Sequence, residues 1–82
     1  MHAVVTREDI EKGLRGDAYH CPIALSLKRL TGMDVYALGF NAGVLGRWVT
    51  ALPLEAVNFM NRFDIGINVE PFTFEYEPKQ VR

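Results

Sequence analysis

Apolar residues recur at the three- and four-residue spacing of an amphipathic helix in three stretches of the chain. In the first stretch only two apolar residues mark the buried side, whereas the second and third stretches present a broad apolar face. The spacing predicts three helices, over residues 7–14, over a segment that starts at Asp17 or Cys21 and ends before Gly32, and over residues 53–63.

Residues at the helix ends support these three helices. Thr6 is a candidate N-cap, and Asp9 three residues later completes a variant of the capping box. Pro22 and Pro53 suit the first helical turn, where the backbone N–H that proline lacks has no helical partner. Gly32 ends the second helix, because glycine readily adopts the left-handed conformation that follows many helices.

Other stretches have the alternating or continuous apolar pattern of strands. Residues 34–40 and 44–52 predict a β-hairpin around a turn at Asn41-Ala42-Gly43. Residues 69–76 alternate cleanly, which predicts a strand with its aromatic side chains on one face and its polar side chains on the other. Residues 4–5 add a short leading strand.

The resulting element order is α-α-β-β-α-β. It predicts an α+β fold, a small single layer of about three antiparallel or mixed strands packed with three helices. The chain has 82 residues and contains no repeat, linker or low-complexity tract, so we expect a single domain over residues 1–82.

Composition excludes several classes of protein. The net charge of -1 with 23% charged residues does not fit a disordered polyelectrolyte, nor the basic excess expected of a binder of nucleic acid polymers. No apolar run approaches the length of a membrane span, and the N-terminus lacks the layout of a signal peptide. A single cysteine makes no internal disulfide, which favours a reducing, cytoplasmic setting.

The chain is rich in apolar residues for its size. Counted with glycine and without tyrosine, they make up about 54% of the sequence, against a usual ~45–50%. A small domain cannot hide this surplus in its interior. We therefore expect a homo-oligomer or another apolar binding face, and the alternative is a monomer that exposes more apolar surface than usual.

The segment with the clearest chemical potential surrounds Cys21, at the start of the second predicted helix and next to His20. The dipole and free N–H groups of a helix N-terminus lower a thiol pKa and can hold an anion. The segment therefore predicts either a reactive thiolate or a site for phosphate or carboxylate, with Arg15 guarding the helix start. The alternative is a buried cysteine beside a capping or surface histidine.

Other candidate residues lie in the predicted hairpin. Arg47 and Trp48 are neighbours in one predicted strand and face opposite ways, so a stacking clamp built from both needs two protomers. The two histidines and the single cysteine show no metal-ligand spacing, so no metal site and no cofactor are predicted. No set of residues forms a recognisable catalytic group.

The run Cys21-Pro22-Ile23-Ala24-Leu25-Ser26-Leu27 resembles a C-P-I-A-L-A-L motif found in small proteins of bacteriophages and prophages. Residues 52–56, 63–64 and 69–75 resemble the closing half of the same proteins. The resemblance covers most of the chain, and the family is functionally uncharacterised, so it carries over no catalytic residues. It implies a small accessory protein in the cytoplasm of a bacterial host cell, one that blocks a host protein or sequesters a nucleotide immune signal as a homo-oligomer.

These arguments lead to a first hypothesis of a non-enzymatic phage-type binding protein, acting in counter-defence, that captures a phosphate-bearing nucleotide signal between protomers. Its candidate ligand-binding residues are Arg15, Tyr19, His20, Cys21, Arg47 and Trp48. The alternative is a protein-interaction module that inhibits a host factor through an apolar face including Leu25 or Phe59. A third hypothesis is an enzyme that uses the Cys21 thiolate.

Overall fold

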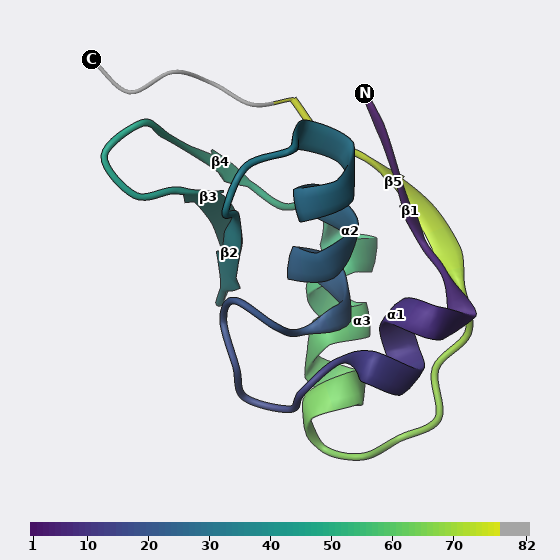
Figure 1. Ribbon diagram of the computed structural model, residues 1–82. Coiled ribbons are helices and arrows are strands. Elements are labelled where there is room, and N and C mark those ends of the chain that lie inside the picture. The colour runs from purple at the N-terminus through teal and green to yellow at the C-terminus, as the bar shows by residue number, and fades with distance from the viewer. Residues whose placement is uncertain (78–82) are drawn as a thin grey trace.

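A computed structural model describes residues 1–77 (Figure 1); residues 78–82, which the sequence predicts as a frayed tail, lie outside the described residues. Residues 1–77 form an α+β fold of three helices and five antiparallel strands in two small sheets, which confirms the predicted fold class. In chain order the elements are β1 (His2–Val5), α1 (Arg7–Lys12), α2 (Pro22–Thr31), β2 (Tyr36–Leu38), β3 (Asn41–Val44), β4 (Trp48–Ala51), α3 (Leu54–Asp64) and β5 (Phe72–Glu75).

The predicted helix ends are confirmed with two adjustments: α1 ends earlier than predicted, and Pro53 is the N-cap of α3 rather than its first helical residue. The Thr6 hydroxyl accepts from the Asp9 N–H at 3.1 Å, and the Asp9 carboxylate accepts from the Thr6 N–H at 2.9 Å, so the capping box is complete. Cys21 caps α2, and Gly32 ends it in the left-handed conformation with φ of 70°. Helix α1 ends at Lys12 rather than residue 14, because Gly13 takes an extended conformation.

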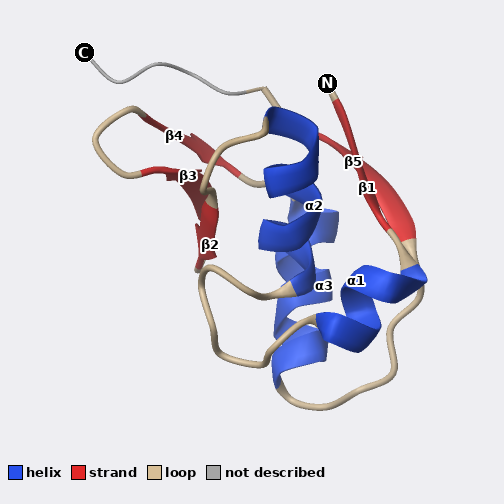
Figure 2. Cartoon of the chain, in the orientation of Figure 1, coloured by secondary structure: helices blue, strands red, loops and turns tan. Residues whose placement is uncertain are grey.

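The strands form two sheets rather than the single layer that the sequence predicts. The leading strand β1 pairs with β5, with Ala3 opposite Phe74, while β2, β3 and β4 form a separate sheet in that order. Helices α2 and α3 lie between the two sheets (Figure 2). Pairing with the N-terminal strand places β5 on the far side of the helices from the other strands.

The predicted turn at Asn41-Ala42-Gly43 is wrong, because these residues lie in β3. The chain instead reverses on either side of β3, at Gly39 and at Gly46, whose φ angles of 60° and 77° few other residues adopt. Gly43 has a different role. A Cβ there would lie 2.9 Å from the Cα of Val49, so glycine allows β3 and β4 to approach closely.

The aromatic face of β5 is confirmed and connects the two sheets. Phe74 and Tyr76 are buried and Phe72 is half-buried, whereas Thr73 and Glu75 are exposed. The Tyr76 hydroxyl donates to the carbonyl oxygen of Ala42 in β3 at 2.6 Å. The continuation of β5 therefore fixes the three-stranded sheet to the rest of the fold.

A partly buried ion pair, between the exposed Arg29 and the buried Asp9, joins the first three elements of the chain. The Arg29 guanidinium of α2 donates to both Asp9 carboxylate oxygens at 2.9 and 2.8 Å, and to the Val4 carbonyl oxygen at 2.7 Å. Burial acts to raise the pKa of Asp9, but hydrogen bonds from Arg29 and from the Thr6 backbone outweigh it and hold the pKa below its ordinary value. Asp9 therefore stays ionised and links α1 to α2 and β1.

Candidate functional site

The start of α2, where the sequence predicts a thiolate or an anion site, faces the protein interior. Cys21 is 4% exposed, and all four residues from Cys21 to Ala24 are buried. The Ala24 N–H donates to the Cys21 sulfur at 3.4 Å, and Pro22 has no N–H to offer an anion. Burial raises the pKa of the Cys21 thiol, which favours its neutral and unreactive form.

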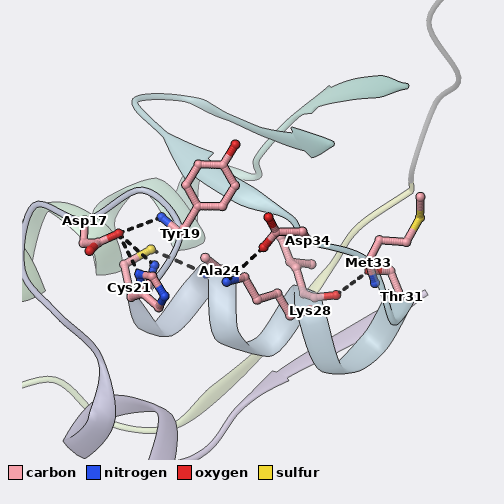
Figure 3. A network of polar contacts seen from close by, with 10 residues as sticks. Asp17, Tyr19, Cys21, Ala24, Lys28, Thr31, Met33 and Asp34 are labelled. Atoms are coloured by element: carbon pink, nitrogen blue, oxygen red, sulfur yellow. Dashed lines mark hydrogen bonds and ion pairs between the residues drawn. The ribbon is translucent and has the colours of Figure 1, made fainter. Parts of the chain in front are cut away.

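The loop before α2 uses its polar groups to hold its own shape (Figure 3). One carboxylate oxygen of Asp17 accepts from the backbone N–H groups of Tyr19 and His20 at 3.0 and 3.1 Å. The same oxygen lies 3.1 Å from Nδ1 of His20. The hydrogen bond to the His20 side chain is the main reason that the pKa of Asp17 is lowered. This is the pattern of an Asx turn, in which an aspartate side chain orders a turn.

The Tyr19 side chain is also engaged in packing. Its half-buried ring lies 6.0 Å from the ring of Tyr36 in β2, between ring centroids. The Lys28 ammonium lies 5.6 Å from the centre of the Tyr19 ring and 3.3 Å from an Asp34 carboxylate oxygen (Figure 3). Tyr19, His20 and Cys21 are therefore close together, as the sequence predicts, but mainly contact the protein's own residues.

The other three predicted ligand-binding residues lie elsewhere. The Arg15 guanidinium lies over Gly66, in the loop after α3. Trp48 is only 7% exposed and packs against Tyr76, with 5.7 Å between ring centroids. Arg47 is exposed in the turn between β3 and β4 rather than in a strand. Within one chain, the six candidates therefore do not line one pocket.

The structure offers a different site, a groove of about 380 Å³ between α3 and residues 68–72. Phe59 and Phe72 form its apolar floor, with 4.8 Å between ring centroids. Asn58, Arg62 and Asn68 line it with polar side chains. Aromatic surface combined with a few convergent polar groups is the usual make-up of a small-molecule site.

Charge is distributed unevenly along this groove. The Arg62 side chain forms no ion pair or hydrogen bond within residues 1–77. Glu55 lies seven residues earlier on α3, about 10 Å away along the helix axis. Glu70, on the opposite wall, is already paired with Arg7 at 2.6 Å. Arg62 and Glu55 therefore lie well apart along the groove, and Arg7 partly neutralises Glu70.

Contacts at the end of α3 hold the second wall of the groove in place. The Ile67 N–H donates to the Arg62 carbonyl oxygen at 3.0 Å, and Gly66 takes a positive φ of 88°. The buried Val69 side chain then anchors the returning chain, and its carbonyl oxygen accepts from Arg7 at 3.4 Å. Helical spacing indicates that Asn58 and Arg62 lie on the polar side of α3, but only the return of the chain encloses them.

A second groove, of about 420 Å³, lies on the other side of residues 68–70. Arg7 and Arg15 line it together with Asn68, so Arg15 is the one predicted residue that lines a large groove. Arg7 is engaged by Glu70, and the groove lacks the paired aromatic floor of the first. Because its guanidinium pair is partly neutralised and Phe63 is its single aromatic lining residue, we regard this groove as the weaker candidate.

The apolar face predicted around Leu25 or Phe59 is poorly exposed. Leu25 is half-buried, and Phe59, on the groove floor, is 7% exposed. Large apolar side chains are instead exposed on the three-stranded sheet and its turns: Leu38, Phe40, Leu45 and Val49. A partner protein would therefore meet more apolar surface at this sheet than at the predicted residues.

Residues 1–77 bring together no group of three or more His, Cys, Asp or Glu side chains that could hold a metal ion. None of the helices in this part of the chain is both long and apolar enough to cross a bilayer. No protein-family model, curated protein or solved structure matches the chain. The resemblance to bacteriophage proteins therefore stays a prediction.

Proposed function

We propose that this chain is a non-enzymatic binding protein that sequesters a phosphate-bearing, nucleotide-like small molecule as a homo-oligomer, with the groove along α3 as its site. One observation carries the proposal: the Arg62 guanidinium, which has no partner within residues 1–77, lines a groove of about 380 Å³ together with two amide side chains and an aromatic floor. The site moves from the start of α2, where polar groups already have partners, to a groove in which Arg62 has none within residues 1–77.

Each part of a nucleotide has a suitable counterpart in the groove. Arg62 offers a planar fork of N–H donors for phosphate oxygens. Phe72 is half-buried, so part of its ring is available to stack on a base. Asn58 and Asn68 can each donate and accept hydrogen bonds at a base edge. The Glu55 carboxylate accepts hydrogen bonds from sugar hydroxyls or an exocyclic amine at the other end.

The lining of the groove favours binding without turnover. It includes no serine, cysteine, histidine or lysine, and one of its two glutamates, Glu70, is already paired with Arg7, so no nucleophile stands beside a free proton carrier. The Cys21 thiol is buried at the start of α2, away from the lining of this groove. The proposed setting, counter-defence in the cytoplasm of an infected bacterium, rests on the resemblance to bacteriophage proteins alone.

The test is isothermal titration calorimetry of the full chain with AMP, GMP, CMP, UMP and, separately, inorganic phosphate. We expect at least one nucleotide to bind more tightly than phosphate, and Arg62→Gln to weaken that binding about 10- to 100-fold, since a charged hydrogen bond contributes about 1.5–3 kcal/mol. Arg47→Gln removes another exposed positive charge, one outside the groove, and should leave affinity unchanged.

Two results would contradict the proposal. The first is that no nucleotide binds better than phosphate. The second is that Arg62→Gln and Arg47→Gln weaken binding equally, which would indicate non-specific attraction of anions. Arg15→Gln separates the two grooves, because Arg15 lines only the 420 Å³ groove. A loss specific to that variant would move the site there.

A further inference from the structure

The three-stranded sheet is formed by the least charged part of the chain. Between Asp34 and Glu55, Arg47 is the only charged residue. This stretch contains all of β2, β3 and β4, and Figure 1 shows their turn extending away from the helices. The chain therefore carries a nearly uncharged sheet at one end of the fold.

The register of the strands assigns each side chain to one of two faces. Ala37 lies opposite Ala42, and both are buried against the helices, together with Trp48. Side chains alternate along a strand, so Leu38 and Val49 belong to the other face. We call this the outer face: Tyr36, Leu38, Asn41, Gly43, Val49 and Ala51.

The outer face and its two turns expose large apolar side chains to water. Leu38 is 66% exposed and Val49 is 44% exposed. Phe40 and Leu45, in the turns before and after β3, are 72% and 81% exposed. A single exposed apolar residue is ordinary on a protein surface, but several on one small sheet are typical of an interaction surface.

The two-stranded sheet shows how this protein treats a sheet surface that stays in water. Its outward positions carry His2, Thr73 and Glu75 beside the half-exposed Val4. Charged and polar residues of this kind keep sheets from associating. The outer face of the three-stranded sheet carries no charged residue, and its only polar side chains are those of Tyr36 and Asn41, so the two sheets differ in this protection.

We propose that the outer face packs against the outer face of a second copy of this chain, related to the first by a two-fold axis. A two-fold interface brings the same patch of both copies together, so charges of one sign on that patch would repel one another across the interface. The outer face contains no charged residue, so two copies of it can meet without repulsion between like charges. Two-fold pairing also removes the patch from water on both copies at once. The inference rests on the homo-oligomer of the proposed function and assigns its interface.

The test is sedimentation equilibrium of the full chain, comparing the unaltered protein with Val49→Lys and Leu38→Lys. We expect a dimer whose dissociation constant rises at least 100-fold in each variant, because the interface would then bury two lysine charges, one from each copy, among apolar side chains. Ile65→Lys is the matched control, since Ile65 is 73% exposed but lies at the end of α3, and it should leave the dimer unchanged. Circular dichroism of each variant checks that the fold is retained.

Leu45→Lys provides a second variant if a strand substitution prevents folding, because Leu45 lies in an exposed turn. An unaltered protein that is monomeric at 200 µM would overturn both the interface and the homo-oligomer, while leaving nucleotide binding by Arg62 to be judged by calorimetry. A dimer that resists the sheet variants but is lost in Ile65→Lys would overturn this interface alone. A monomer that binds a different protein through Val49 would also overturn it.

Discussion

The region around α1 and α2 and the groove along α3 use polar side chains in opposite ways. Around α1 and α2, Asp9, Asp17 and Arg29 all have partners within the fold. In the groove along α3, Arg62 has none within residues 1–77. Burying or ordering a polar group is costly unless it is paired, so the first set serves folding. An unpaired cation beside a groove remains free to interact with a ligand.

The sharpest test of the paired polar groups around α1 and α2 is Asp9→Ala, for which we expect the largest loss of stability. The change removes both hydrogen bonds to Arg29 and the acceptor for the Thr6 N–H. Breaking a buried pair typically costs about 3–5 kcal/mol, and we expect about 2–3 kcal/mol here because the Arg29 side chain is half-exposed to water. Urea unfolding at pH 7 measures the difference.

The pH dependence gives the same prediction an independent check. The folded-state pKa of Asp9 is below its ordinary value of 3.8, so the carboxylate stabilises the fold fully above that pH. Its contribution is lost as the pH falls through the folded-state pKa, and the gap between unaltered protein and Asp9→Asn should close there. Glu8→Gln is the control, because the exposed Glu8–Lys12 pair should contribute less than about 0.5 kcal/mol. Equal losses in the Glu8 and Asp9 variants would contradict a structural role specific to Asp9.

The sequence predicts the region around α1 and α2 well because the residues that cap these helices act locally. Thr6, Asp9, Pro22 and Gly32 act within one helical turn of their own positions, and each performs the predicted role. For Cys21 the sequence leaves two interpretations open, a buried cysteine or an accessible thiolate, since an N-cap cysteine can equally face solvent. What decides it is packing against residues distant in the sequence.

The features that the sequence does not predict all depend on long-range contacts. The single predicted layer divides because β1 pairs with β5 across nearly the whole chain. The turn at residues 41–43 is misplaced because Gly43 provides close strand approach, whereas Gly39 and Gly46 make the turns. The groove is missed because Arg62 resembles any solvated charge until residues 68–72 return across α3. Periodicity assigns a residue to a face but does not show what will cover that face.

Substitutions at Cys21 test whether the segment at the start of α2, which the sequence predicts to be reactive, serves to stabilise the fold. We expect Cys21→Ala to lower stability by about 1 kcal/mol, since it removes the sulfur that caps α2, and Cys21→Ser to lower it less because an acceptor remains. The native thiol should react with a disulfide reagent only as fast as the chain opens. Rapid labelling of the folded protein, at the rate of a free thiol, would show that the segment is accessible and would revive the thiolate hypothesis.

We expect the smallest effect for a substitution in the groove along α3, at Asn68. This residue lines the groove from the returning chain and is exposed, so its amide contributes little to folding. We expect Asn68→Ala to leave the urea midpoint unchanged and to weaken nucleotide binding about 3- to 10-fold, the effect of one neutral hydrogen bond. Asn61→Ala is the matched control, because Asn61 is an exposed asparagine on α3 that does not line the groove. A loss of stability without a loss of affinity would assign Asn68 to the scaffold, and the groove would then have one fewer group available for a ligand.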